Sequence, residues 1–206
     1  MKRHDDHGQA DDAKVAQWLS LAASGDQQAW RGLVDQYARR IFAMAWSRLR
    51  SAESAEEITQ SVFATVAVKL CNGAYTEQGR FESWLFRVAM NRVRDEVRRS
   101  SRQAAPAGPE LFERMEGRAR ENESGAGSTG TAELRRAIAR LGDSEQEMIH
   151  LRHHAGLSFK QIADLLEEPL GTVLARHHRT LRKLKGMLEG TEESAETDAS
   201  DEGRYA

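Results

Sequence analysis

The sequence predicts an all-α protein in which two small helical domains are joined by a flexible linker. Apolar residues recur at helical spacing in two blocks, from about Val15 to Ser100 and from about Ala132 to Leu188. Segments that alternate apolar and polar residues, as strands do, are absent, and the chain contains only three prolines. Between the blocks the chain is rich in glycine, serine, alanine and proline, a composition typical of a flexible linker.

The same observations set the expected domain boundaries. One helical domain is expected over residues 20–100 and another over 132–188, with the linker at 101–131 and an N-terminal extension at 1–19. The segment 189–206 contains seven acidic residues against one arginine and almost no apolar side chains, so we expect a disordered acidic tail.

Local start signals divide the two blocks into about four helices each. Three segments match the capping box, in which a serine accepts a hydrogen bond from the backbone three residues later: Ser54–Glu57, Ser144–Glu147 and Ser158–Gln161. Gly25–Asp26 and Gly142–Asp143 mark breaks before helices.

Charge is segregated along the chain, although the net charge is only −2. Seven arginines against three acidic residues lie between Arg80 and Arg102. Five basic residues and no acid lie between Gly171 and Leu188. Such asymmetry is typical of proteins that bind a polyanion.

The sequence gives no support for catalysis, a cofactor or a metal site. Cys71 is the single cysteine, so neither an intramolecular disulfide nor a cysteine zinc site is expected. The pairs His153–His154 and His177–His178 cannot chelate a metal well alone, because adjacent helical side chains point about 100 degrees apart. A secretory signal and a membrane-spanning apolar run are also missing, so we expect a cytoplasmic protein. A glycine-rich phosphate loop, a supported Ser/His/Asp order and paired carboxylates in a plausible cleft are missing too, so we do not expect an enzyme.

Residues 80–100 combine an apolar stripe with many arginines. The stripe comprises Phe81, Trp84, Leu85, Val88 and Ala89. At this spacing we expect Trp84 to pack in the core rather than to stack on a base. The arginines lie around this stripe and give the segment its net positive charge.

Residues 157–188 are predicted to form a helix-turn-helix. The first helix is expected from about Ser158 to Leu166 and ends before Pro169, because the residue before a proline disfavours helix. The second begins at Gly171 or Thr172. Its inner stripe is predicted to comprise Leu170, Val173, Leu174, His177, Leu181, Leu184 and Leu188. Its free face is basic and suits the major groove of DNA.

An ordinary helical hairpin with a solvated charged face is the alternative for these two helices. The missing acids argue against it, because a face that is merely soluble usually mixes both signs of charge.

Three motifs, in this order along the chain, carry a resemblance to a known family. They are SAEEITQSVF at residues 54–63, F-x-x-W-L-x-x-V-A-x-N-x-x-x-D-x-x-R from Phe81 to Arg98, and GTVLARHHRTLRKLK at the end of the helix-turn-helix. Together they resemble bacterial RNA polymerase sigma factors of the sigma-70 family, extracytoplasmic-function (ECF) type. The resemblance covers about residues 20–188. It implies a sigma2 and a sigma4 domain in a factor that binds core RNA polymerase and directs promoter recognition, DNA melting and transcription initiation.

The resemblance implies that the last sigma2 helix and the loop before it bind the promoter −10 element as single-stranded DNA with a flipped base. The matching candidates are Asn72, Tyr75, Gln78, Arg80, Arg87, Asn91, Arg92, Arg94 and Arg98.

The resemblance also implies a polymerase-binding helix and a duplex-binding helix. The helix from about Ser54 to Lys69 resembles the segment that binds the clamp helices of the largest polymerase subunit, through Glu56, Glu57, Gln60 and Phe63. Ile58, Val62 and Phe63 also fit a purely structural core. Candidates for the −35 element are Thr172, Ala175, Arg176, His178, Arg179, Arg182 and Lys183. The family's sigma4 domain also contacts the flap of the second-largest subunit, and anti-sigma factors commonly hold such proteins.

The chain departs from the family pattern at several positions. Ser54 and Ser61 stand where aspartate and glutamate are usual, which weakens one or two expected polymerase contacts. Leu174 and Ala175 stand where a basic residue and serine are frequent. An aliphatic pair cannot donate hydrogen bonds but can pack on a thymine methyl group, so an unusual −35 preference is expected.

Other interpretations remain open at this point. A helix-turn-helix regulator would bind duplex DNA without polymerase, and a helical adaptor would use its arginines to bind an acidic protein. The acidic tail is either solvated or folds back on the basic helix and competes with DNA.

Overall fold

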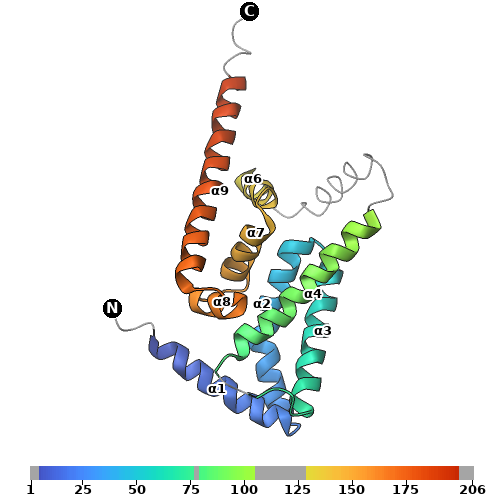
Figure 1. Ribbon diagram of the computed structural model, residues 1–206. Helices are drawn as coiled ribbons and strands as arrows, with labels where there is room; N and C mark the ends of the chain where they lie inside the picture. The colour runs from blue at the N-terminus through green and yellow to red at the C-terminus, as the bar shows by residue number, and fades with distance from the viewer. Residues whose placement is uncertain (1–4, 77–78, 105–128, 200–206) are drawn as a thin grey trace, which may run out of the picture. The chain divides into compact units, whose positions relative to one another are not determined.

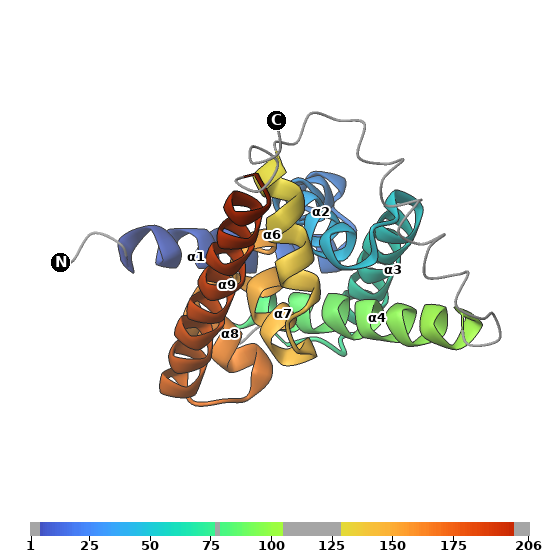
Figure 2. The same cartoon turned by 90° about the horizontal axis from the view of Figure 1, so that it is seen from above.

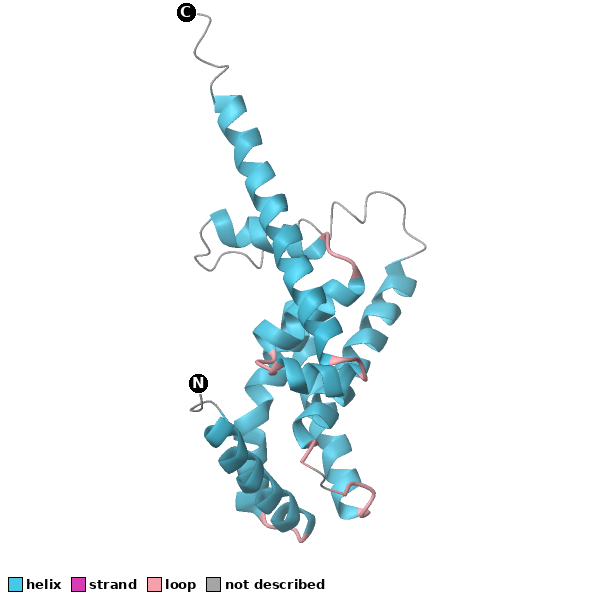
Figure 3. Ribbon diagram, turned by 60° about the vertical axis from the view of Figure 1, so that its left-hand side comes forward, coloured by secondary structure: helices cyan, strands magenta, loops and turns pink. Residues whose placement is uncertain are grey.

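The computed structural model describes the backbone of residues 5–76, 79–104 and 129–199, and the side chains of residues 13–76, 79–102 and 130–190. Within these ranges every regular element is a helix, which confirms the predicted all-α class (Figures 1 and 3). None of the described helices is long and apolar enough to cross a membrane.

The first of two compact units groups residues 1–106 with residues 150–167. Its described helices are α1 (Asp5–Ala23), α2 (Gln27–Leu49), α3 (Ala52–Cys71), α4 (Phe81–Ala104), the π-helix η1 (His150–His154) and α8 (Phe159–Leu166). Helix α2 packs against α1, α3, α4 and η1, and α4 packs against α3 and α8. The core between them contains the fully buried side chains of Leu33, Ile41, Met44, Val62, Val66, Leu85 and Phe86.

The second compact unit groups residues 107–149 with residues 168–206. Its described helices are α6 (Thr129–Ala139), α7 (Asp143–Ile149) and α9 (Leu170–Ala199). Both α6 and α7 pack against α9, as Figure 2 shows. Ala137, Leu141, Ile149 and Leu184 form the buried cluster of this unit. The buried Gln146 amide donates to the carbonyl of Leu141 at 2.8 Å, which ties α7 to the end of α6.

These units divide the chain differently from the predicted domains, because α8 belongs to the first unit. Ser83 donates to the carbonyl of Gln161 at 3.3 Å, and the Gln161 amide donates to the Glu82 carboxylate at 2.9 Å. Arg40 pairs with Glu82 and donates to the carbonyl of Ala155 at 2.7 Å. Helical periodicity cannot reveal such contacts between distant residues. The domain boundaries expected from the sequence remain a prediction.

The helix starts confirm some predicted signals and correct another. Ser158 forms the predicted capping box of α8, since its hydroxyl accepts from the backbone of Gln161 and the Gln161 side chain accepts from the backbone of Ser158. Asp26 caps α2, as expected from the break at Gly25–Asp26. The prediction that Ser54 begins a helix is wrong, because Ser51 caps α3 three residues earlier.

Helix α7 begins at Asp143, next to the predicted break. The prediction that Ser144 caps it is wrong, because the helix already begins one residue earlier. The bond from a third helical residue back to the cap backbone, one half of a capping box, is made by Glu145. Its carboxylate accepts a hydrogen bond from the backbone of Gly142 at 2.9 Å.

Two helices are longer than predicted. Helix α1 begins at Asp5, inside the predicted N-terminal extension, and its Val15 and Leu19 are buried. Helix α9 runs to Ala199, so residues 189–199 continue the helix instead of beginning a disordered tail. Glutamate and alanine favour helix, and Lys185 pairs with Glu189 one turn later at 3.3 Å.

The contact between α1 and α2 leaves no room for a side chain at Gly32. A Cβ atom there would lie 2.6 Å from Cε2 of the Trp18 indole. We expect Gly32→Ala to lower the free energy of unfolding by about 1–3 kcal/mol, because the ring must move although alanine favours helix. Thermal denaturation measures the change.

Gly186→Ala in α9 is the matched control for this substitution. Gly186 also lies within a helix, but apart from the backbone of its own helical turns no atom would lie within 4 Å of its new Cβ. Alanine there should stabilise the protein by about 0.5–1 kcal/mol. Equal effects at both positions would contradict the close contact of Gly32 with Trp18.

Candidate nucleic-acid and polymerase interfaces

Five of the candidate −10 residues share one face of α4. Arg87, Asn91, Arg94 and Arg98 follow at intervals of four, three and four residues, and Arg80 precedes the helix in the same angular position. We call these five residues the α4 stripe. Asn91, Arg94, Arg98 and Arg80 are exposed, and Asn91 accepts a hydrogen bond from Arg94 at 3.1 Å. The structure therefore brings most of the predicted cationic path together.

The apolar face of α4 is rotated relative to the prediction. Phe81, Leu85 and Ala89 are buried as predicted, whereas Trp84 and Val88 are only half-buried. The prediction missed Phe86, Met90 and Val93, which are buried. Helix α4 packs against α2, α3 and α8, and the side it presents to them includes Phe86, Met90 and Val93 rather than Trp84 and Val88.

Aromatic rings gather where the loop after α3 enters α4. Tyr75 and Trp84 lie with ring centroids 4.7 Å apart, and Tyr75 also meets Phe81 edge-on at 5.7 Å. Tyr75 and Trp84 are both half-buried, so each presents part of a ring at the surface. Asn72 is exposed at the C-terminal cap of α3, and Gln78 lies outside the described residues.

Arg87 and Arg92 donate hydrogen bonds to residues outside α4. Arg87 donates to the Glu167 carboxylate at 2.8 Å and to the carbonyl of Asp164 at 2.9 Å. Arg92 lies on another side of α4 from the stripe and donates to Thr65 Oγ1 at 2.8 Å. The geometry thus separates Arg92 from the other candidates.

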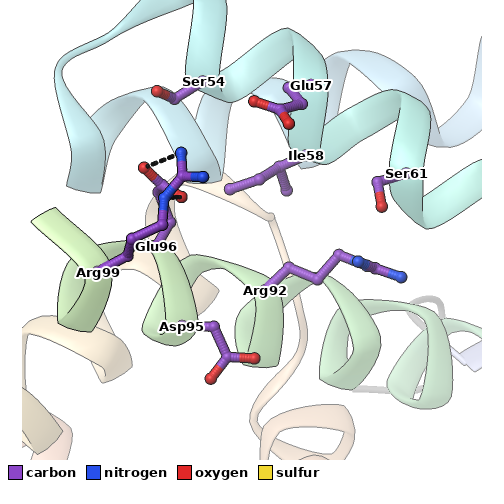
Figure 4. Close-up of a pocket in the computed structure, with 8 residues that line it drawn as sticks. All are labelled: Ser54, Glu57, Ile58, Ser61, Arg92, Asp95, Glu96 and Arg99. Atoms are coloured by element: carbon purple, nitrogen blue, oxygen red, sulfur yellow. Dashed lines mark hydrogen bonds and ion pairs between the residues drawn. The ribbon is translucent and has the colours of Figure 1, made fainter.

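A pocket of about 190 Å³ lies between α3 and α4. The lining comprises Arg92, Asp95, Glu96 and Arg99 of α4 and Ser54, Glu57, Ile58 and Ser61 of α3 (Figure 4). Asp95 lies at its margin, with its carboxylate pointing away from α3. Arg99 and Glu96 form an ion pair at 3.0 Å within it. With both signs of charge present and partly paired, the lining has no net preference for one class of ligand.

Three of the four candidate polymerase residues, Glu56, Gln60 and Phe63, share one side of α3, and Glu57 lies at the pocket. Glu56 and Gln60 are exposed one turn apart, Phe63 is half-buried, and Glu57 is exposed at the edge of the pocket. Ile58 and Val62 are buried core residues. The side chains that could bind a partner are therefore distinct from those that hold the helix.

On α9, five candidate −35 residues share one exposed face: Thr172, Ala175, His178, Arg179 and Arg182. Arg176 is half-buried and donates twice to the Glu168 carboxylate, at 2.8 and 2.6 Å. Lys183 donates to Glu145 at 2.7 Å, and this hydrogen bond, followed by that from the Gly142 backbone, lowers the pKa of the Glu145 carboxyl.

The predicted inner stripe of α9 is only partly correct. Val173 and Leu184 are buried, but Leu170, Leu174 and Leu181 are exposed by 46%, 43% and 42%. Burial follows the line of Val173, Thr180 and Leu184, and the three exposed leucines lie on one flank of it. No signal in the sequence distinguishes a flank leucine from an inner one.

Among the described residues no group of three or more possible metal ligands is present. Helix η1 contains His150 as well as His153 and His154. His150 is buried, and its Nδ1 lies 2.8 Å from Ser47 Oγ. Burial lowers the pKa of His153 and His154, and lowers that of His150 to about 3.

An all-helical chain with basic faces on two helices, one beside an aromatic loop junction, has the features of a DNA-binding transcription factor. Comparison with known proteins defines it further. Residues 33–103 match the family described as Sigma-70 region 2, and residues 137–186 match Sigma-70, region 4.

Relatives agree with these matches. The chain is 33% identical to the ECF RNA polymerase sigma factor SigE of Mycolicibacterium smegmatis, over 86% of this chain and 69% of that protein. It is 26% identical to SigW of Bacillus subtilis, over 82% of this chain and 94% of SigW. This chain therefore belongs to the ECF RNA polymerase sigma factors.

Solved structures show the same fold. The structure of CnrH in complex with the cytosolic domain of CnrY matches with a TM-score of 0.61 at 23% identity, over 88% of this chain and 98% of that chain. As a sigma factor, the protein acts with RNA polymerase in transcription initiation at promoters, and sigma factors are regulators rather than catalysts.

Proposed function

We propose that three surfaces of this sigma factor divide the work of initiation. The exposed side of α3 docks on the clamp helices of core RNA polymerase, the α4 stripe binds the melted −10 strand, and the exposed face of α9 binds the −35 duplex. The observation that carries the proposal is the position of the two basic faces, since residues 81–103 of α4 fall in the region 2 match and residues 170–186 of α9 in the region 4 match. Cations on a helix face fit a phosphate path.

The aromatic rings of Tyr75 and Trp84 offer a stacking surface for a flipped base. Tyr75 and Trp84 are half-buried rings beside the start of the α4 stripe. Partly exposed aromatic faces stack on unpaired bases with little sequence preference, while nearby polar groups such as Asn72 read base edges. Trp84, expected from the sequence to be core, joins Tyr75 in this role.

Arg87 reaches the −10 strand only after exchanging its present partners. Its guanidinium is bound by Glu167 and by the carbonyl of Asp164. A phosphate is the natural replacement, because it offers the same paired oxygen acceptors with more charge. Binding of DNA along the whole stripe therefore requires α8 to release Arg87.

Further partners follow from the family. The flap of the second-largest polymerase subunit is the proposed contact of the second unit. A solved relative, RpoE of Bartonella quintana, is in complex with the anti-sigma factor NepR. By this precedent an anti-sigma factor is a proposed partner of this chain. The place of action is the cytoplasm, where polymerase works, and the factor contributes no catalytic residue of its own.

Run-off transcription by core polymerase on genomic promoter fragments tests the proposal. Discrete transcripts that require this protein are expected, and permanganate should reveal unpaired thymines near −10. Replacing Arg94 and Arg98 together by alanine should reduce both signals by about tenfold or more, because two phosphate contacts are lost.

The matched control removes two exposed arginines of α2, Arg31 and Arg39, from the same unit. That variant should transcribe like the wild type. Binding of duplex DNA without any core-dependent transcript would instead support the helix-turn-helix regulator.

A further inference from the structure

A strip of exposed leucines runs along one flank of α9. Leu170, Leu174 and Leu181 occur at intervals of four and seven residues, so they lie nearly in line on the helix. Each keeps more than two fifths of its surface in contact with solvent. We call them the leucine strip. Three aligned and exposed leucines form a patch that water solvates poorly.

The surroundings of the leucine strip define what can cover it. His178, Arg182 and Lys185 lie next to it on the exposed side of α9. Arg182 and Lys185 carry positive charge, and Lys185 is also paired with Glu189 at 3.3 Å. No acidic residue occurs between Gly171 and Leu188. A suitable ligand is therefore strongly anionic and also presents apolar groups beside its charges.

Duplex DNA meets both requirements in its major groove. The phosphates supply the negative charge, and each thymine projects a 5-methyl group into the groove, the one apolar group among the base edges there. The first turns of a recognition helix commonly reach base edges, and Leu170 and Leu174 lie in the first two turns of α9.

We propose that Leu174, with Leu170 beside it, recognises thymine through its methyl group in the upstream promoter element. The inference rests on the proposed binding of the −35 duplex by α9 and adds the base that it selects. Arg179 and Arg182, exposed on the same helix, hold the phosphates.

Leucine also disfavours the other bases at these positions. Its side chain neither donates nor accepts a hydrogen bond, so a guanine or cytosine edge pressed against it loses water without replacement. Guanine could instead be recognised by an arginine that donates two hydrogen bonds to it. Arg176 is less available for this contact, because its guanidinium already donates to the Glu168 carboxylate. The expected element is thus rich in thymine opposite the start of α9.

Uracil substitution tests the methyl contact directly. Holoenzyme is assembled from core polymerase and the full chain on a promoter identified by run-off transcription, and upstream thymines are replaced singly by deoxyuridine. Wild-type affinity should fall about fourfold at each contacted thymine, the effect of leaving one methyl group unburied. Leu174→Ala should bind the thymine and uracil promoters equally. Leu134→Ala is the matched control, at a leucine of α6 that is exposed by 39% against 43% for Leu174, and it should keep the wild-type difference.

The outcomes separate this inference from the function on which it rests. If wild-type holoenzyme transcribes specifically but does not distinguish thymine from uracil, the methyl contact is refuted and the sigma function stands. If Leu174→Ala keeps the full thymine preference, or loses affinity equally for both promoters, the leucine strip serves another ligand, such as a protein. Absence of any core-dependent transcript overturns both.

Discussion

Lowering the pH from 7 to 4 is expected to remove about 3 kcal/mol from the free energy of unfolding through one side chain, His150. This residue is 4% exposed, and burial lowers its pKa from 6.5 to about 3, helped by the positive charges of His154, Arg48 and Arg50. The Ser47 hydroxyl donates its proton to the carbonyl of Met44 at 2.7 Å. Its oxygen therefore accepts a hydrogen bond from Nδ1 of the neutral His150 ring.

The direction of the effect follows from which state binds the proton. Below about pH 6.5 the unfolded chain protonates His150, whereas the folded chain keeps the ring neutral until about pH 3. The stability that the neutral ring contributes is complete above pH 6.5 and declines as the pH falls toward 3. Urea denaturation at a series of pH values measures this slope.

His150→Asn isolates this contribution. An asparagine amide can donate to Ser47 where the ring nitrogen did, but it does not titrate in this range. The variant should therefore lose stability with falling pH less steeply than the wild type. His178→Asn, at an exposed position of α9, should retain the wild-type slope. Identical slopes for all three proteins would show that His150 titrates alike in both states.

Reversing the charge of Glu56 is expected to weaken binding to core polymerase about a hundredfold. The side chain is exposed on α3 beside Gln60 and lies outside the core, so the helix itself should survive. A like-charge contact in an interface costs several kcal/mol, and 1.4 kcal/mol corresponds to about tenfold in affinity. Titration of labelled Glu56→Arg with core polymerase, alongside run-off transcription, measures the effect.

Asp35→Arg is the control for this substitution, with the same change of charge at an exposed site of α2. It should bind core polymerase like the wild type, and both variants should melt near the wild-type temperature. Should Glu56→Arg bind normally, the docking role proposed for this side of α3 would be withdrawn, together with those of Glu57, Gln60 and Phe63.

Features set by near neighbours in the chain could be predicted from the sequence. Ser158 caps α8 because its hydroxyl and Gln161 are brought together by one helical turn. Arg87, Arg94 and Arg98 share a face of α4 because their spacing matches the helical repeat. Where two local signals competed the prediction failed, as when Ser51 capped α3 ahead of Ser54.

Features set by distant residues could not be predicted. Nothing near Arg87 in the chain indicates that Glu167, eighty positions later, would bind it. His150 carries no local mark of burial, since its partner Ser47 comes from α2. Leucine periodicity likewise gives the direction of a helix face but not how far the neighbouring helices extend over it, so Leu174 was wrongly assigned to the inner stripe.

The two consecutive glutamates between α8 and α9 affect how DNA binding responds to salt. Glu167 holds Arg87 and Glu168 holds Arg176, one arginine in each unit. When such an arginine moves to a phosphate, it releases the counterions of the nucleic acid but leaves behind a carboxylate that attracts cations from solution. The net release of ions is then smaller than the number of basic residues at the interface suggests. If the proposed contacts form, the affinity of this sigma factor for promoter DNA should fall less steeply with rising salt concentration than its arginine content implies.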